Sequence, residues 1–315
     1  MVALYHAPIE APVRANALVG NGYLYVDFFF VLSGFVIAHA WADRLRDAAS
    51  ARAFLIRRWG RLWPLHVATL AFLLALECTK AIAGMAGLWH GGAFLGGNTG
   101  WTLFTNLLLI HAWGLHSGIY WNFPSWSVST EWAAYLVFAA VTLLAGRFWI
   151  AAMAAVGLAA GVAFFWLSPA RIDATFDYGV LRCVESFALG TLVHLAWQRF
   201  HAAPVALATT LQVISLAIVG WALIRLGTGK ASHLVPLPFA LAVFAFALPA
   251  GALAAPLGIR PLRALGDWSY SIYLNHIGVV MVMKILATAT VAAMAPSWMH
   301  MRDDALIFSS GALAN

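Results

Sequence analysis

Three arginines stand within five positions of a strongly apolar chain, in the segment "LIRRWGRLWPLH" at residues 55–66. Arg58 and Arg61 share one face if this segment is helical, and planar guanidinium groups bind phosphate oxygens well. Trp59 could stack a ring beside them. One interpretation of Arg57, Arg58 and Arg61 is therefore a binding site for an anionic ligand. The other is a topology signal that also binds lipid headgroups.

Further polar side chains recur at helical spacing inside apolar stretches. Two trios each share a helical face, namely Ser127, Glu131 and Tyr135 at four-residue intervals, and Ser269, Tyr273 and His276 at i, i+4 and i+7. A charge at the centre of a membrane span costs about 2.5–3.5 kcal/mol on insertion scales. Each ionisable residue in such a stretch therefore needs a partner or a function.

Some of these polar and small residues favour a structural role. Arg182 and Glu185 are three positions apart, so we interpret them as a mutually neutralising pair. Asp27 and Gly34 fall on one face, and Gly34 with Ala38 forms a pattern of small residues four apart. This stripe is expected to pack against a neighbouring helix.

Composition defines the elements that must position these residues. Hydrophobic residues make up 63% of the 315-residue chain and charged residues 10%, which excludes an ordinary soluble domain. We predict an all-α, polytopic transmembrane helix bundle, because apolar spans must be helical. The segments predicted to span the membrane are 22–41, 62–82, 101–113, 126–146, 148–168, 178–198, 203–225, 234–255 and 268–294, for a total of about 9–10 spans.

Charge distribution orients this bundle. The arginine-rich segment 42–61 is predicted to be a cytoplasmic loop by the positive-inside rule. The later loops do not fix on which side of the membrane the following helices begin. The sidedness of all of them depends on whether the short segment 101–113 spans the membrane. The formal net charge of +6 is spread over membrane loops, so no nucleic-acid partner is expected. The histidines are scattered without metal-ligand spacing, so no metal is expected either.

Four segments in the same order resemble the acyltransferase 3 family of integral membrane O-acyltransferases. They are "YVDFFFVLSGFVI", "FLIRRWGRLWPLH", "PSWSVSTEWAAYLVF" and "LGDWSYSIYLNHIGVV". The opening "VALYH" is similar to the end of the family's first helix, with His6 as the matching histidine. The family also has an arginine upstream of that histidine, and many members have a further C-terminal helix. We therefore expect one domain over 1–315, truncated at its N-terminus and possibly at its C-terminus.

This resemblance implies a reaction and a location. Arg58 and Arg61, with Arg57 and Trp59, would bind acyl-CoA, with acetyl as the expected acyl group. His6 would act as general base toward a hydroxyl of a glycan or lipid-linked glycan, and Asp27 or Glu131 would orient its ring. Both direct transfer and an acyl-histidine relay stay open. The family implies the bacterial inner membrane, with membrane lipids as further partners.

The competing function is a transporter or flippase whose intramembrane charges line a substrate path. The arginine pair combined with a histidine at a helix end favours the enzyme. The enzyme hypothesis predicts that His6 and the Arg58/Arg61 face open into one polar cavity, lined also by Glu131 or Asp27. Ser269, Tyr273 and His276 are expected along the channel for the acceptor.

Overall fold

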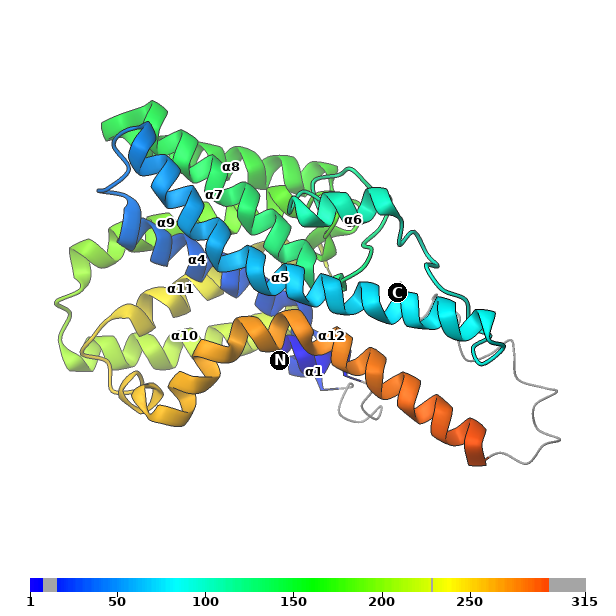
Figure 1. Cartoon of the computed structure of the whole chain (residues 1–315). Helices are drawn as coiled ribbons and strands as arrows, with labels where there is room; N and C mark the ends of the chain where they lie inside the picture. The colour runs from blue at the N-terminus through cyan, green and yellow to red at the C-terminus, as the bar shows by residue number, and fades with distance from the viewer. Residues whose placement is uncertain (8–15, 228, 295–315) are drawn as a thin grey trace.

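The computed structural model describes residues 1–7, 16–227 and 229–294, and it describes side chains only up to residue 287. All regular elements of these residues are helical (Figure 1). The α-helices are α1 (Val2–His6), α3 (Ala17–Gly20), α4 (Tyr25–Trp41), α5 (Ala48–Met85), α6 (Gly100–Leu107), α7 (Trp126–Ala145), α8 (Trp149–Leu167), α9 (Gly179–Phe200), α10 (Val205–Arg225), α11 (Pro236–Ala247) and α12 (Arg260–Met294). Short 3-10 turns are η1 (Gly22–Leu24), η2 (Phe123–Ser125), η3 (Gly146–Phe148), η4 (Arg171–Asp173), η5 (Lys230–Leu234) and η6 (Ala255–Gly258).

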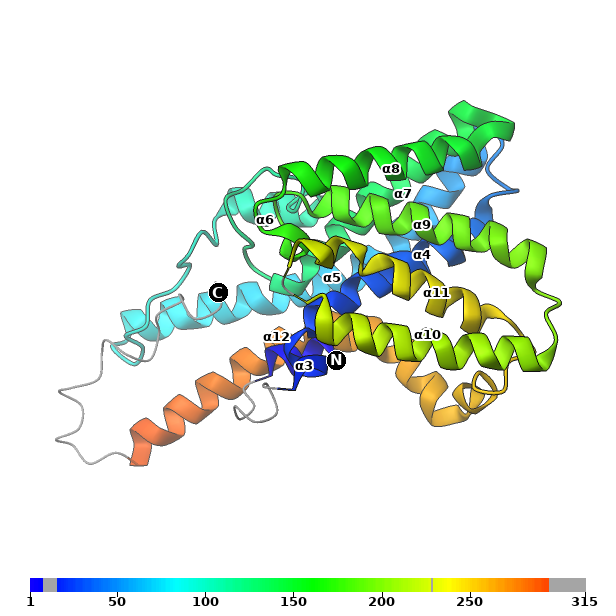
Figure 2. The same cartoon turned by 180° about the vertical axis from the view of Figure 1, so that it is seen from behind.

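Seven helical stretches of the described residues are long and apolar enough to cross a membrane. The longest, Phe123–Leu167, contains both α7 and α8, which pack side by side after the turn at η3 (Figures 1 and 2). Every predicted span except 101–113 overlaps one of these helical stretches, although the stretch that matches 234–255 ends at Ala247 with α11. The predicted all-α polytopic bundle is therefore confirmed, whereas the C-terminal tail in which we expect a truncation lies outside the described residues.

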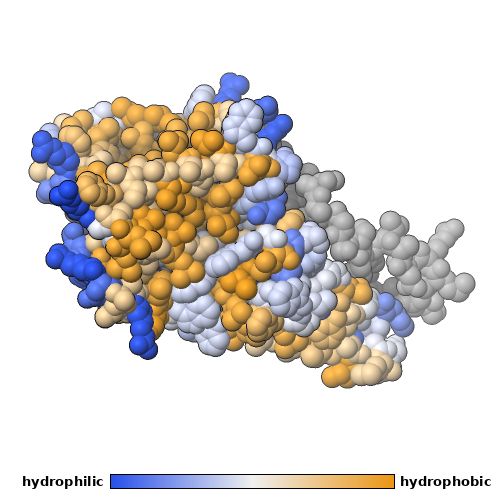
Figure 3. Space-filling model, turned by 90° about the horizontal axis from the view of Figure 1, so that it is seen from above, coloured by the Kyte–Doolittle hydropathy of each residue, from blue (hydrophilic) through white to orange (hydrophobic). Residues whose placement is uncertain are grey.

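The outer surface of the bundle matches a lipid environment. Large apolar side chains such as Leu158 and Trp166 on α8, and Ile214 and Trp221 on α10, are exposed. Figure 3 shows broad apolar areas on one face of the molecule, with hydrophilic residues concentrated toward its edges. Exposed apolar area on this scale is stable only in contact with lipid or another apolar partner.

Helix α5 begins earlier than the hydropathy pattern predicts. Asp47 caps it by accepting a hydrogen bond from the backbone N–H of Ser50 at 2.8 Å, and the Ser50 hydroxyl accepts one from the Asp47 N–H at 3.1 Å. The backbone N–H of Ser50 and the Ser50 hydroxyl, which also donates to Asp47 Oδ1 at 2.8 Å, lower the pKa of the Asp47 carboxyl. The prediction of a loop over 42–61 is therefore wrong beyond residue 47, and the arginine cluster lies on the helix itself.

The predicted span at 101–113 is wrong. Helix α6 has eight residues, and Leu109 then takes a left-handed backbone conformation with φ of 54°. Ser129 of α7 forms hydrogen bonds with the loop that follows. Its hydroxyl donates to the Leu109 carbonyl at 2.8 Å, and its carbonyl accepts from the Trp113 indole N–H at 3.0 Å. Irregular backbone at this position is tolerated because protein groups supply its hydrogen bonds.

Helices α4 and α9 form the central contact of the bundle. A Cβ atom on Gly34 would lie 2.0 Å from the backbone oxygen of Phe187, and one on Gly190 would lie 2.0 Å from that of Val31. Only glycine permits such a close approach of two backbones. The predicted packing of the Asp27–Gly34–Ala38 stripe against a neighbouring helix is confirmed.

The same interface contains a buried ion pair. Arg182 on α9 donates from Nε to Asp27 Oδ1 at 2.9 Å and from Nη2 to Asp27 Oδ2 at 2.7 Å. The predicted pairing of Arg182 with Glu185 is wrong. An i, i+3 neighbour on the same helix is available, but the bidentate carboxylate on α4 satisfies the guanidinium fork more completely.

Candidate active site

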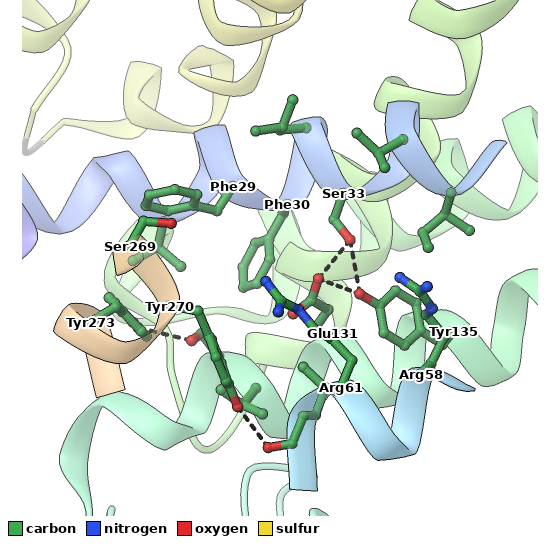
Figure 4. Close-up of a pocket in the computed structure, with 17 residues that line it drawn as sticks. Phe29, Phe30, Ser33, Arg58, Arg61, Glu131, Tyr135, Ser269, Tyr270 and Tyr273 are labelled. Atoms are coloured by element: carbon green, nitrogen blue, oxygen red, sulfur yellow. Dashed lines mark hydrogen bonds between the residues drawn. The ribbon is translucent and has the colours of Figure 1, made fainter. Parts of the chain in front are cut away.

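A cavity of about 290 Å³ lies between α4, α5, α7 and α12 (Figure 4). Its polar lining consists of Ser33, Arg58, Arg61, Ser127, Glu131, Tyr135, Ser269, Tyr270 and Tyr273. Its apolar lining is supplied mainly by α4, with Val26, Phe29, Phe30, Leu32, Val36 and Ile37. An apolar wall facing a few convergent polar groups is the usual construction of a small-molecule site.

Arg58 and Arg61 share one face of α5, as their spacing predicts, and both line the cavity. Neither forms an ion pair with an acidic side chain among the described residues. The Arg61 guanidinium lies 5.8 Å from the centre of the Tyr270 ring, and Arg58 Nε is buried without a hydrogen-bond partner in the part of the chain that the structure describes. A buried donor left unsatisfied is costly, so this cavity is suited to an anionic ligand.

Arg57 and Trp59 do not line the cavity. Arg57 lies over the Trp41 ring, with its guanidinium carbon 5.5 Å from the ring centre. Trp59 stacks on Trp63 at 6.2 Å between ring centres and meets Trp132 edge-on at 5.0 Å. Adjacent positions on a helix point about 100° apart, which explains why only part of the arginine cluster reaches the cavity.

Glu131 forms the centre of a hydrogen-bond network in the cavity. It accepts hydrogen bonds at 2.6 Å from both the Ser33 and the Tyr135 hydroxyls (Figure 4). The predicted shared face of Ser127, Glu131 and Tyr135 is thus confirmed, since all three line the cavity. Hydrogen bonds to one carboxyl oxygen from two helices fix the position of the Glu131 side chain in the cavity that Arg58 and Arg61 also line.

Sequence reasoning missed Ser33 and Tyr270. Ser33 is the sole hydroxyl-bearing residue between the tyrosine and tryptophan that bound α4, and its partner Glu131 is 98 positions away. Tyr270 lies within the matched segment "WSYSIYL", and its hydroxyl donates to the Leu62 carbonyl at 2.7 Å. A polar residue in an otherwise apolar span was a usable signal for Ser33, but its partner could not be read from helical spacing.

His6 lies beside the cavity and does not line it. Its ring contacts Tyr5 and Phe123, with ring centres 4.8 and 5.5 Å apart, and its Nδ1 lies 3.1 Å from His276 Nε2. Tyr273, one turn from His276 on α12, belongs to the cavity lining. The prediction that His6 shares one cavity with the arginines is therefore wrong, and the contacts that lead from the cavity to His6 run through Tyr273 and His276.

The predicted channel residues of α12 face two different places, the cavity and His6. Ser269 and Tyr273 face the cavity, and the Tyr273 hydroxyl lies 2.8 Å from Ser127 Oγ and donates to the Pro124 carbonyl at 3.1 Å. His276 is buried and faces His6. The polar residues of α12 therefore extend from the cavity lining, at Tyr273, to the contact of His276 with His6.

Neither candidate carboxylate orients His6 in the described structure. Both oxygens of Asp27 are bound by Arg182, and Asp27 is not in the cavity lining. Glu131 is bound by Ser33 and Tyr135. Within the part of the chain that the structure describes, no group of three or more His, Cys, Asp or Glu side chains could hold a metal ion.

An apolar helix bundle with two arginines and a carboxylate around a cavity is the construction of an integral membrane protein with an internal polar site. The chain belongs to the acyltransferase 3 family, because the family's sequence profile, described as an acyltransferase domain, matches residues 1–301. The resemblance inferred from the four segments is confirmed, and the protein is an enzyme that transfers acyl groups.

Two curated proteins are similar to this chain. "Acyltransferase MdmB" of Streptomyces mycarofaciens is 28% identical over 293 residues, which cover 82% of this chain and 68% of that protein. "Protein 2 in picA locus" of Rhizobium radiobacter is 32% identical over 125 residues, which cover 38% of this chain and 65% of that protein. No solved structure matches the chain.

Proposed function

We propose that this acyltransferase takes its acyl group, in the simplest case acetyl, from acyl-CoA and transfers it to a hydroxyl of a glycan or lipid-linked glycan. The observation that carries the proposal is the cavity with Arg58 and Arg61, which no acidic side chain of the described residues neutralises by an ion pair. Acyl-CoA offers phosphate groups to such guanidinium forks. The apolar α4 wall would accommodate the acyl end.

His6 is proposed as the general base. The acceptor O–H proton passes to the imidazole while the oxygen attacks the thioester carbonyl, the C–S bond breaks, and the proton is returned to the departing thiolate. An imidazole can do this at neutral pH because its ordinary pKa is about 6.5. Tyr273 would have to turn aside for the two substrates to meet. Catalytic contacts are often incomplete in the absence of substrates.

One end of the bundle is proposed to face the cytoplasm. Because long helices that are consecutive in the sequence run in opposite directions (Figures 1 and 2), residues 42–47, 146–148, 201–204 and 248–259 lie at one end of the bundle. Basic residues at this end include Arg44, Arg46, Arg52, Arg147, Arg199, Arg260 and Arg263. The positive-inside rule therefore supports a cytoplasmic location for this end, in an inner membrane if the organism is bacterial.

The competing function of transporter or flippase lacks a comparable observation. Arginine and carboxylate side chains in a cavity suit either function, but the chain belongs to a family of acyltransferases. Family membership therefore favours the enzyme over a transporter or flippase.

Lysine at position 58 or 61 is expected to weaken the binding of acetyl-CoA to the purified protein by about tenfold or more. Lysine keeps the charge but cannot form the bidentate fork, and one lost hydrogen bond to a charged group is worth about 1.5–3 kcal/mol. Calorimetric titration of Arg58→Lys and Arg61→Lys in detergent micelles measures this loss.

Arg57→Lys is the matched control, because Arg57 is adjacent in sequence and lies over Trp41 outside the cavity. It should bind acetyl-CoA like wild type. If all three variants bind equally well, the arginines serve only topology and lipid contact, and the donor assignment fails.

A further inference from the structure

A groove of about 640 Å³ lies at the turn between α9 and α10, away from the candidate active site. The turn, residues 201–204, connects two candidate membrane spans, Gly179–Phe200 and Val205–Arg225. The groove therefore begins where the bundle meets the membrane–water interface, at the end proposed to face the cytoplasm. Its volume is that of an ordinary ligand pocket, roughly 300–1,000 Å³.

Small side chains and a short helix leave this groove open. Ala202, Ala203 and Pro204 of the turn line it and fill little space. Helix α11 packs against both α9 and α10 but ends after twelve residues (Figure 2). Phe244 near its end and Leu248 just beyond it supply apolar side chains to the groove.

Hydrogen bonds between the three helices hold the walls of the groove in place. The Trp197 indole N–H on α9 donates to the Ala247 carbonyl of α11 at 2.9 Å. The Gln212 side chain on α10 donates to the Ala245 carbonyl at 3.3 Å and accepts from the Leu253 N–H at 2.9 Å. The groove is thus preformed, and a ligand does not have to order its walls.

Charge is confined to one side chain of the groove. Arg199 is the sole charged residue in the lining, and it is exposed. It forms no ion pair with an acidic side chain among the described residues. The apolar lining continues to Leu211, seven residues beyond Pro204, which is about 10 Å along the α10 axis. A cation at the interface above an apolar groove matches a phospholipid, whose phosphate lies above its acyl chains.

We propose that this groove binds an anionic phospholipid such as phosphatidylglycerol, with the phosphate on Arg199 and one acyl chain along Leu211 and Phe244. Guanidinium groups bind phosphate oxygens well. The ammonium group of phosphatidylethanolamine finds no acidic partner in the lining, so the anionic lipid is preferred. The groove shares no lining residue with the cavity that contains Arg58 and Arg61. The inference therefore stands independently of the proposed function.

Native mass spectrometry of the purified protein compares the binding of phosphatidylglycerol and phosphatidylethanolamine with identical acyl chains. Wild type should bind phosphatidylglycerol more tightly. Arg199→Gln should weaken this binding by about fivefold, the effect of one arginine beside anionic lipid, and should remove the preference. Ala203→Trp places a large side chain in the groove and should weaken the binding of both lipids. Circular dichroism shows whether each variant is folded.

Arg147→Gln is the matched control. Arg147 lies at the same end of the bundle, but its guanidinium carbon is 4.6 Å from the centre of the Phe148 ring and outside the groove. This variant should keep the wild-type preference for phosphatidylglycerol. An equal loss in Arg147→Gln and Arg199→Gln would reduce both arginines to general surface charge and overturn the inference.

Two further results would also overturn the proposed lipid site. Equal binding of the two lipids by wild type would show that the groove does not distinguish headgroup charge. Unchanged lipid binding by Ala203→Trp would show that lipid does not occupy the groove, and a simultaneous loss of protein dimers in the same spectra would assign the groove to a second copy of the chain.

Discussion

Replacing His6 by alanine is expected to lower kcat for acyl transfer by about 10²–10⁴, the usual contribution of a general base. Binding of acetyl-CoA should remain near wild type, because His6 does not line the cavity that contains Arg58 and Arg61. The measurement is transfer of radiolabelled acetyl groups from acetyl-CoA to lipid-linked glycans extracted from bacterial membranes, by purified protein in liposomes.

His90→Ala is the control for this experiment, since His90 is exposed in the loop after α5. It should transfer acetyl groups at the wild-type rate. Normal turnover by His6→Ala would remove His6 from the mechanism and would make His276 the next histidine to test as the base.

Breaking the Asp27–Arg182 ion pair is expected to lower the free energy of unfolding by about 3–5 kcal/mol, because one charge is then left buried without its partner. Both Asp27→Asn and Arg182→Leu should show this loss. The double variant Asp27→Leu/Arg182→Leu should recover much of it, since no lone charge remains. Unfolding of the purified protein by sodium dodecyl sulfate, followed by circular dichroism, compares their stabilities.

Glu185→Gln is the matched control for this pair. Glu185 is the acidic neighbour of Arg182 on the same helix but forms no ion pair with it. Its replacement should cost less than about 1 kcal/mol, the typical value for substitutions away from a buried network. A loss as large as that of Asp27→Asn would contradict the geometry of the α4–α9 interface.

Features that depend on one helix were predictable from the sequence. Helical periodicity correctly placed Ser127, Glu131 and Tyr135 on one face, and it correctly placed Arg58 and Arg61 on one face. The small residues Gly34 and Ala38 correctly indicated a close helix contact. These predictions hold because 3.6 residues per turn fixes which neighbours on a helix share a face.

Features that depend on contacts between helices were not predictable in the same way. Arg182 binds a carboxylate 155 positions away, and His6 binds an imidazole 270 positions away. Periodicity says which side chains share a face but not which helix that face meets. The nearest sequence neighbour, Glu185, was therefore a reasonable but wrong partner for Arg182.

Helix boundaries were wrong where hydropathy and local hydrogen bonding disagree. The arginines made 48–61 polar enough to resemble a loop, although the Asp47–Ser50 capping box and the alanine-rich sequence favour a helix start. The apolar stretch 101–113 resembled a span, yet it leaves the helical conformation at Leu109, whose carbonyl accepts a hydrogen bond from the Ser129 hydroxyl. Hydropathy measures the preference for lipid, whereas capping and turn residues decide where a helix begins and ends.

The central claim is that acyl-CoA binds in the cavity between α4, α5, α7 and α12, and photolabelling tests it most directly. An acyl-CoA with a diazirine in its acyl chain should label Phe29 and neighbouring cavity residues of α4 and α12, identified by mass spectrometry of the digested protein. Excess acetyl-CoA should suppress the labelling, and the double variant Arg58→Ala/Arg61→Ala should lack it. Labelling confined to other surfaces, or labelling that acetyl-CoA does not suppress, would contradict the account.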